Sequence, residues 1–247
     1  MNWNVKFEKF ISTMENEYFR ELLLEGLVNT IKVAVLGLLI GILIGSVIAV
    51  VKVAPKYKFI IRMLDKICTM YVAIFRGTPI VVQLSLAYYV LLPTMGVRDV
   101  DSLTVGIIVF GMNSGAYVSE IMRGGLNSVD IGQMEAGRAV GLSYPLTMIK
   151  IIIPQAIKNI LPTLGNEFIT LIKETSVLSF ITVYDLYTAL VDTIGAKNYE
   201  KMVPYIVLAL IYIVLVLLIT LMVKLLEKAF AKSDRNRAQG KKSIKAV

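Results

Sequence analysis

Two long stretches of the chain carry no charged residue. Val33 to Val51 is uncharged over 19 positions, and Met202 to Val223 is uncharged over 22. At about 1.5 Å per residue, either stretch would be long enough as a helix to cross a hydrocarbon core of about 30 Å. Two buried helices of a water-soluble protein would be unusual at this length, so the pattern predicts helices that span a membrane.

Hydropathy and segment length predict five spans in all, at about residues 26–51, 78–95, 103–123, 154–173 and 203–224. The apolar stretch 59–75 carries Arg62, Asp65 and Lys66 at helical spacing. This favours an interfacial helix, or the lower part of a long second helix, over a separate span. The mixed stretch 175–201 is expected to form an outward-facing helix and loop. The predicted fold class is an all-α membrane protein with five transmembrane helices.

Composition supports a membrane protein, because 56% of the 247 residues are hydrophobic and the mean hydropathy is +0.71. Ordinary soluble domains contain roughly 45–50% apolar residues. No cleavable signal peptide is expected, since residues 1–25 contain five glutamates where a signal peptide would have a basic and then an apolar region. We therefore expect the first span to anchor the chain.

The distribution of charge predicts the orientation. The connection from Lys52 to Arg76 holds six basic residues against one acidic residue, and the tail from Lys224 onward is also strongly basic, so both should be cytoplasmic. The turn at 98–101 has no positive excess and should face outward. This places an extracytoplasmic segment at 1–25, a membrane domain at 26–228 and a basic cytoplasmic tail at 229–247. The net charge of +8 lies mostly beside spans, so a nucleic-acid partner is not expected.

The chain lacks several kinds of chemistry at the level of sequence. It has no histidine and one cysteine, Cys68, which argues against zinc sites, histidine-based catalysis and an intrachain disulfide. No phosphate-binding loop is present, because the Gly240-Lys241 pair lacks the earlier glycine and the following hydroxyl. We expect a protein that is not an enzyme and that binds neither a metal nor a cofactor.

Polar residues inside spans are costly in lipid, so they commonly face a partner or a water-filled path. In the third predicted span, Asn113, Tyr117 and Glu120 share one helix face. Together with polar residues of the second and fourth spans they could line a cavity for a small zwitterion. They could equally pair with one another or sit at span ends, which is the better interpretation for Glu120. The candidate substrate-binding residues are Gln83, Tyr88, Asn113, Ser114, Tyr117, Glu120, Asn166 and Glu167.

Two further patterns concern packing and docking. Gly37, Gly41 and Gly45 form a face of small residues that lets another helix approach closely, so a packing role is predicted. Residues 130–141 predict a short helix that is ended by Gly141 and followed by Pro145. Its small apolar positions could enter a groove on another protein, or the helix could lie on the bilayer. Spacing alone leaves both possibilities open.

The last pattern resembles a known signature. Glu135-Ala136-Gly137, three residues, Gly141, nine residues and Ile151-Ile152-Ile153-Pro154 resemble the EAA loop of permease subunits of ABC importers, with Gly137 and Ile153 in place of alanine and leucine. Segments resembling the polar amino-acid branch of this family are Phe75-Arg76-Gly77-Thr78-Pro79 with Gln83, Gly115 to Gly125, Gly132 to Ala136, and Lys173 to Ser176. The resemblance runs from about residue 25 to residue 225.

The resemblance implies a type I ABC importer (MetI-like) permease fold in the plasma membrane of a prokaryote, with the N-terminus outside and the C-terminus inside. It implies a second permease subunit, identical or related, and a cytoplasmic ABC ATPase dimer that binds ATP and Mg. It also implies an extracytoplasmic amino-acid-binding protein that delivers a polar, possibly basic, L-amino acid such as arginine, histidine, lysine or glutamine. The residues implied to couple the permease to the ATPase are Gly132, Gln133, Glu135, Ala136, Gly137, Arg138 and Gly141.

Two other classes of protein compete with this interpretation. A secondary transporter driven by an ion gradient would have an inverted repeat of broken helices, which five spans cannot form from two equal halves. An intramembrane enzyme would need a catalytic constellation that cannot be assembled from the spacing of the residues. Either alternative should be active without an ATPase partner.

Overall fold

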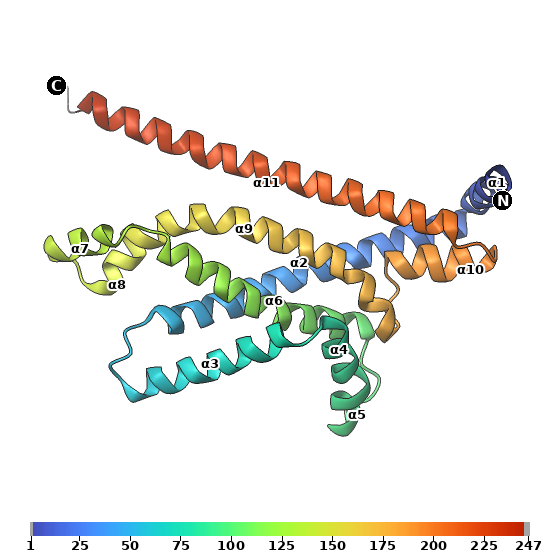
Figure 1. Cartoon of the computed structure of the whole chain (residues 1–247), viewed down its shortest axis with the longest axis horizontal. Helices are drawn as coiled ribbons and strands as arrows, with labels where there is room; N and C mark the ends of the chain where they lie inside the picture. The colour runs from blue at the N-terminus through green and yellow to red at the C-terminus, as the bar shows by residue number, and fades with distance from the viewer. Residues whose placement is uncertain (1, 245–247) are drawn as a thin grey trace.

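The computed structural model describes residues 2–244, with side chains for residues 2–229. Within that range every regular element is helical, as predicted. Four long helices run along one axis: α2 (Glu17–Val53), α6 (Ser102–Asn127), α9 (Ile153–Glu174) and α11 (Met202–Ile244). Figure 1 shows them side by side, with α1 at one end of the bundle and α7 and α8 at the other. Of the basic tail predicted at 229–247, residues 245–247 lie outside the described part of the chain. The side chains from residue 230 onward also lie outside it.

Helices α2 and α6 pack closely because their small residues interlock. A Cβ on Gly41 would lie 2.7 Å from Ser114 Oγ, and one on Gly45 would lie 2.8 Å from the backbone nitrogen of Ser119. Gly111 on α6 is equally crowded from the other side by Ile40. The packing role predicted for the glycines of α2 is confirmed. The contact depends on residues without a side chain, as in other closely approaching membrane helices.

The second predicted span differs from a straight helix at 78–95. Helix α3 (Phe59–Gly77) is followed, after a bend of 105°, by α4 (Ile80–Ser85), the π-helical segment η1 (Leu86–Leu91) and α5 (Leu92–Thr94). Pro79 lacks a backbone N–H, and the residue before a proline avoids the helical region, so Thr78 is extended at φ −124° and ψ 143°. The helix therefore breaks between Gly77 and Ile80.

The stretch expected as an interfacial helix or the lower part of the second span forms α3, which is largely exposed and contacts the bundle through Val72. Val72 of α3 forms a buried cluster with Ile48 of α2 and Ala116 of α6. Of the charges that argued for an interface, Asp65 lies two turns before Val72 on the same face of α3 and pairs with Lys56 Nζ at 2.6 Å. Helix α3 is thus part of the bundle, and the bent pair α3 and α4–α5 forms either a broken span or a re-entrant loop.

Three helices are long and apolar enough to cross a membrane, or four if the bent pair is one span, among the described residues. These are α2, α6 and residues 202–229 of α11. Helix α9 forms at the predicted fourth span but carries Lys158, Asn159 and Glu167, with Pro162 inside it. Its neighbours are α2, α6 and α11. The polar and charged residues of α9 keep its composition below that of an isolated apolar span.

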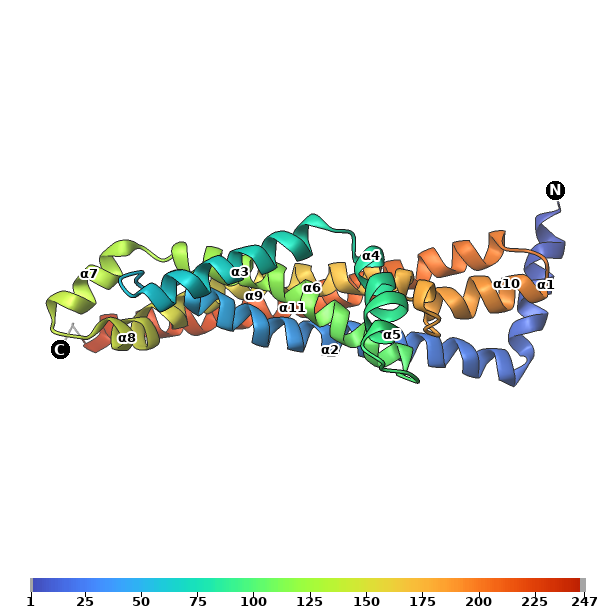
Figure 2. The same cartoon turned by 90° about the horizontal axis from the view of Figure 1, so that it is seen from below.

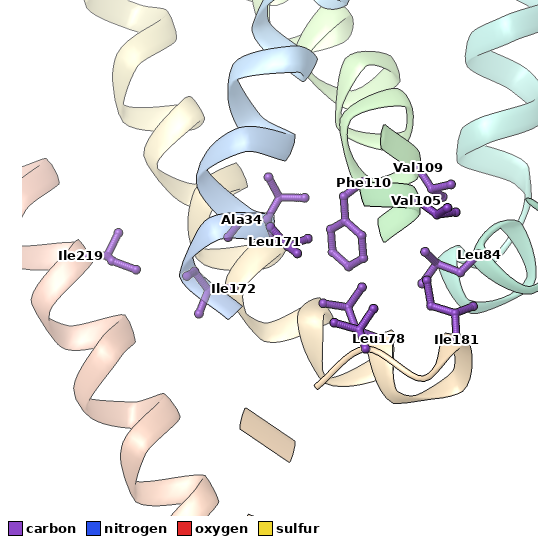
Figure 3. Packing of buried hydrophobic residues seen from close by; sticks show 12 residues of the cluster. Ala34, Leu84, Val105, Val109, Phe110, Leu171, Ile172, Leu178, Ile181 and Ile219 are labelled. Atoms are coloured by element: carbon purple, nitrogen blue, oxygen red, sulfur yellow. The ribbon is translucent and has the colours of Figure 1, made fainter. Parts of the chain in front are cut away.

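The main core lies where α2, α6 and α9 meet the segment after α9. Phe110 is buried at its centre, between Ala34 and Leu171 on one side and Leu178 on the other (Figure 3). Leu178 belongs to η3 (Thr175–Ile181), a 3₁₀ segment that continues from α9. The stretch 175–201, expected to form a helix and loop, is partly helical, and its first turns pack against the core.

A second cluster lies near the N-terminus. Phe19 of α2 packs with Leu190 and Ile194 of η4 (Thr188–Ile194), a π-helical segment followed by α10 (Gly195–Lys197), and with Leu208 of α11. Helix α1 (Trp3–Glu15) joins this cluster and is separated from α2 by Asn16 alone. The boundary expected between residues 25 and 26 therefore falls inside α2, and the break in the chain comes at residue 16.

Candidate functional site

The short helix predicted at 130–141 forms as α7 (Ile131–Ala139) and is capped at both ends. Asp130 Oδ1 accepts a hydrogen bond from the Gly132 backbone N–H at 2.6 Å. At the other end the N–H of Gly141 donates to the carbonyl of Arg138, and the N–H of Leu142 donates to that of Gly137. This paired pattern needs a residue with positive φ, and Gly141 has φ +85°. The prediction that Gly141 ends this helix is therefore confirmed.

Gly137 is buried in the contact between α7 and α8 (Tyr144–Thr147). A Cβ at this position would lie 2.5 Å from Thr147 Cγ2 and 3.0 Å from Thr147 Oγ1. Thr147 is itself fully buried and donates a hydrogen bond to the carbonyl of Ser143. Glycine in place of the second alanine of the EAA signature thus has a local reason, because only glycine fits against Thr147.

The opposite side of α7 faces outward. Ile131 is 75% exposed and Val140 is 77% exposed, and the side chains of Glu135, Arg138 and Ala139 are exposed as well. This surface is a short rigid knob with apolar ends and two opposite charges. It lies at the end of the bundle farthest from α1 (Figure 2). A knob of this kind suits insertion into a groove on another protein.

Three polar contacts join the α7 end to the long helices. The Tyr144 hydroxyl donates to the carbonyl of Val53 at the end of α2, and burial raises the pKa of this phenol. Asn159 Nδ2 of α9 donates to Ser128 Oγ, just after α6, at 2.7 Å. Gln155 of α9 also donates to Gln133 Oε1 of α7 at 3.3 Å. The position of α7 is therefore linked to α2, α6 and α9.

The connection from α8 into α9 is helical throughout. The π-helical segment η2 (Met148–Ile152) fills the interval, and Pro154 lies in the first turn of α9. A proline here removes one backbone donor, which favours a locally widened turn before it. The proline predicted to open the next span therefore lies at the start of α9 without breaking the helix.

Among the candidate binding residues, Ser114 of α6 and Glu167 of α9 are brought together. Ser114 Oγ donates to Glu167 Oε1 at 2.9 Å, and both residues are buried. Gly41 of α2 packs against Ser114 from the other side. A buried carboxylate with one neutral hydrogen-bond donor retains most of its capacity to accept further donors.

Gln83 and Asn113 are joined by a different contact. Gln83 Nε2 donates to the carbonyl oxygens of Phe75 and Thr78, both at 2.9 Å, and Asn113 Nδ2 donates to Gln83 Oε1 at 3.0 Å. These bonds satisfy the carbonyls that lose their helical partners at the break before α4. The polar atoms of the two amides are thus largely occupied in stabilising the bend.

Tyr117 and Glu120, on the same face of α6, each contact a basic residue. The Arg76 guanidinium lies over the Tyr117 ring at 5.4 Å from its centroid. Arg123 Nη2 donates to Glu120 Oε2 at 2.5 Å within α6. The helix face predicted from spacing exists, but its three residues do not line one shared cavity. Asn113, Tyr117 and Glu120 instead contact residues of α3, α4 and α6.

The structure does not bring Tyr88 and Asn166 into contact with the other candidates. Tyr88 packs edge to face with Tyr89, beside a cavity of about 310 Å³ at the turn after α5. Asn166 is exposed on α9, where its carbonyl accepts from Thr170. Two contributors were missing from the predicted site residues: Arg76, a flanking charge that also lies within a family-like segment, and Thr147, which belongs to no motif. Only the tertiary contacts reveal their roles.

No group of three or more His, Cys, Asp and Glu that could hold a metal ion occurs among the described residues. A larger cavity of about 570 Å³ lies between α2, α9 and α11, lined mainly by apolar side chains such as Phe168 and Met222. Lys158, Asn159 and Glu227 also line this cavity.

Comparison with known proteins agrees with this architecture. Residues 37–232 match the family model described as "Binding-protein-dependent transport system inner membrane component". The arginine transport system permease protein ArtQ of Bacillus subtilis is 38% identical over 212 residues, covering 86% of this chain and 94% of the relative. The L-cystine transport system permease protein TcyB of the same organism is 35% identical over 211 residues, covering 85% and 87%.

A putative glutamine transport system permease protein GlnP of Rickettsia conorii is 36% identical over 222 residues, covering 90% of this chain and 97% of the relative. Among solved structures, the crystal structure of an amino acid ABC transporter with histidines has a TM-score of 0.80 at 38% identity, covering 89% of this chain and 98% of that one. The inward-facing MetNI methionine ABC transporter has a TM-score of 0.70 at 19% identity, covering 87% and 98%, which shows the shared fold alone.

The family match places nucleotide binding and hydrolysis in a separate ATPase subunit and not in this chain. A helical bundle with several membrane-length helices, a capped knob between α6 and α9, and a family model that spans most of the bundle agree with one another. The chain belongs to the binding-protein-dependent transport system inner membrane components, the multi-pass permease subunits of bacterial ABC importers.

Proposed function

We propose that this permease subunit carries a polar or basic L-amino acid and is coupled to its ATPase through α7. The observation that supports this most directly is the shape of α7. It is capped at both ends, held on its inner side by Thr147 and exposed on its outer side. Such a helix can transmit a force because it does not need to fold on contact.

The coupling surface is proposed to consist of the exposed residues of α7. Glu135 and Arg138 would form charge pairs with the ATPase, and Ala136 would allow close approach. Gly132 and Gln133 lie on the side nearer the bundle, while Gly137 and Gly141 set the shape of the helix. Closure of two ATPase subunits around ATP and Mg would then move α7 as a rigid body.

The substrate class is proposed from the buried carboxylate of Glu167. A carboxylate between α6 and α9 favours an ammonium or guanidinium group, provided that the ligand replaces the hydrogen bonds of water. Relatives of the chain are named for the transport of arginine, glutamine and L-cystine. Ser114 and Glu167 are the proposed contacts, while Gln83 and Asn113 are proposed to shape the neighbouring wall.

The proposed assembly has two permease subunits, two ATPase subunits and an extracytoplasmic amino-acid-binding protein. The N-terminus would face outward and the C-terminus inward, which puts α7 on the cytoplasmic side. The strong positive charge after Lys224 supports this orientation, because basic flanks are retained in the cytoplasm. Helix α1 would then lie on the extracytoplasmic side.

The coupling proposal is tested by reversing one charge on α7. In proteoliposomes that hold the permease, its ATPase and the binding protein, Glu135→Lys should abolish the stimulation of ATP hydrolysis by substrate while the permease stays monodisperse. Glu21→Lys makes the same reversal on an exposed side chain of α2 at the far end of the bundle and should preserve stimulation. Equal stimulation in the two variants would reject α7 as the coupling element.

The substrate proposal is tested by neutralising one carboxylate. Glu167→Gln keeps the oxygen that accepts from Ser114 but removes the charge. We expect uptake of arginine to fall at least about tenfold, equivalent to about 1.4 kcal/mol, while glutamine uptake changes much less. Glu174→Gln, two helical turns further along the same face of α9, is the comparison variant. Equal losses for arginine and glutamine would refute a charge-specific role for Glu167.

A further inference from the structure

Helix α1 has an apolar stripe that the rest of the chain leaves uncovered. Trp3, Phe7 and Ile11 are spaced four residues apart, so they share one face, and they are 41%, 42% and 56% exposed. Phe10 and Met14, one heptad after Trp3 and Phe7, lie along the same face and pack against the second core cluster. The rest of the chain therefore covers only part of the apolar surface of α1.

Polar contacts hold α1 in place. Lys6 Nζ pairs with Glu200 Oε1 at 2.8 Å, and Asn198 Nδ2 donates to Thr13 Oγ1 at 2.8 Å. Glu200 also accepts from the backbone N–H groups of Met202 and Val203, so it caps the start of α11 at the same time. The stripe is turned about a quarter turn away from this docked side, at 100° per residue.

The direction of α1 is unlike that of the long helices. It lies across the end of the bundle, whereas α2 and α11 run along it (Figure 2). Since α2 and α11 are membrane-length helices, a helix lying across their ends runs parallel to the membrane surface. A stripe about a quarter turn from the bundle contact can then face the bilayer.

Other exposed aromatic rings occur at this end of the bundle. Tyr18 begins α2, Tyr199 precedes α11 and Tyr205 lies in its first turns, and all three are exposed. Tryptophan and tyrosine gather at membrane interfaces because an apolar ring with a polar atom suits the headgroup level. The three tyrosines mark that level independently of α1, and α1 is tied to it by Glu200 and Asn198.

From these contacts we propose that α1 is an interfacial anchor, whose Trp3–Phe7–Ile11 stripe inserts into the boundary between headgroups and acyl chains at the end of the bundle opposite α7. Glu8 and Ser12, on the far side of α1, then face water. The helix is short and mostly polar on that side, which suits an element that lies on a membrane rather than one that crosses it. This inference does not depend on the substrate or on the coupling role of α7.

Trp3 is the sole tryptophan of the chain, so its fluorescence reports this position directly. The full-length permease is reconstituted in phosphatidylcholine and phosphatidylglycerol vesicles, with bromine atoms carried either near the headgroup end or near the terminal methyl end of the lipid chains. We expect blue-shifted Trp3 emission, a large loss of emission with bromine near the headgroup, a smaller loss with bromine near the chain end, and little quenching by iodide.

Two variants show whether the stripe is responsible. Phe7→Glu places a charge in the stripe and should shift Trp3 emission to the red and make it accessible to iodide. Val5→Glu is the matched control, since Val5 is equally exposed at 44% but lies on the opposite side of α1, and this change should leave Trp3 as in the native protein.

Three results would overturn the proposal. Full quenching of native Trp3 by iodide without quenching by brominated lipid would place the stripe in water, ready for a soluble partner. Protection from both quenchers would place it against protein, such as a second copy of this chain. Stronger quenching by bromine near the chain end would mean that α1 enters the bilayer core.

Discussion

Gly137 offers the sharpest test of how α7 is held. Alanine is the residue that the EAA signature carries at this position, and in an open helix Gly→Ala would stabilise by about 1 kcal/mol. Here the new Cβ would lie 2.5 Å from Thr147 Cγ2, inside a contact that is already buried. Overpacking of this kind costs about 1–3 kcal/mol. The net expectation for Gly137→Ala is therefore a loss of about 0–2 kcal/mol.

The same geometry predicts a rescue. Thr147→Ser removes Cγ2, the atom 2.5 Å from the new Cβ, and keeps the hydroxyl that donates to Ser143. Serine alone should cost about 1 kcal/mol for the lost methyl group. In Gly137→Ala/Thr147→Ser the two changes should compensate, with a favourable interaction of about 1–2 kcal/mol in the double-mutant cycle.

The assay is thermal unfolding of the four proteins in one detergent, followed by size-exclusion chromatography of the heated samples. For a chain of this size, 1 kcal/mol corresponds to about 2–4 °C in Tm. The double variant should lie above the sum of the single effects by about 2–8 °C on that scale. Strict additivity would show that the contact between Gly137 and Thr147 does not constrain the helix, and the reasoning would fail.

Three further substitutions test other parts of the fold. Gly45→Ala brings a Cβ to 2.8 Å from the backbone nitrogen of Ser119 and should destabilise the protein by about 1–2 kcal/mol. The control Gly124→Ala meets nothing within 4 Å and should be neutral or stabilising. Equal Tm values for the two variants would contradict the contact between α2 and α6. Gln83→Leu should lower the free energy of unfolding by about 1–3 kcal/mol, because it leaves carbonyl groups at the helix break unpaired. The control Gln155→Leu, at an exposed position, should lower it by about a few tenths of a kcal/mol. A similar loss in both variants would refute this role of Gln83. Asp101 caps α6, and the side-chain hydrogen bond from Thr104 is the main cause that lowers the pKa of Asp101 below 3.8. Asp101→Ala should therefore destabilise the protein by about 1 kcal/mol at neutral pH, and by less as the pH falls through the lowered pKa. A loss of stability that stays unchanged in acid would exclude a carboxylate cap.

Much of the helical framework was predictable because it depends on local pattern. The uncharged runs within α2 and α11 are recognisable by their length alone. Gly141 ends α7 because glycine readily adopts the positive φ that this position requires. The glycine face of α2 was also correctly assigned to packing, since its spacing places all three residues on one side. These features need no knowledge of which helix is the neighbour.

The break in the second span was not predictable from hydropathy. The apolar content of 78–95 suits a membrane helix, but a hydropathy average takes no account of Pro79 or of the extended Thr78 before it. The contact of Val72 in α3 with α2 and α6 was likewise not predictable from composition. Local composition reports polarity, whereas the bend and the packing depend on backbone donors and tertiary neighbours.

The candidate binding residues were grouped by helix face, which is only half of the necessary information. Spacing placed Asn113 and Tyr117 on one side of α6, but it could not indicate that one contacts α4 and the other lies beneath Arg76. Ser114 and Glu167 are 53 positions apart and share no motif, yet their side chains are hydrogen-bonded. Pairing between helices is set by the crossing of α6 and α9, which no single-helix pattern encodes.

That crossing also gives the proposed coupling helix a physical route to the buried carboxylate. Thr147 contacts Gly137 of α7, and the chain from Thr147 stays helical through η2 and α9 to Glu167, 20 residues or about 30 Å further along. Between these points Ile160 packs tightly against Gly125 of α6. A displacement of α7 would therefore act on α9 as a whole, because packed helices shift as rigid elements more readily than they deform. The Gly137→Ala and Thr147→Ser pair perturbs the start of this route without touching Glu167, so an accompanying change in substrate affinity would show that α7 and the buried site are coupled.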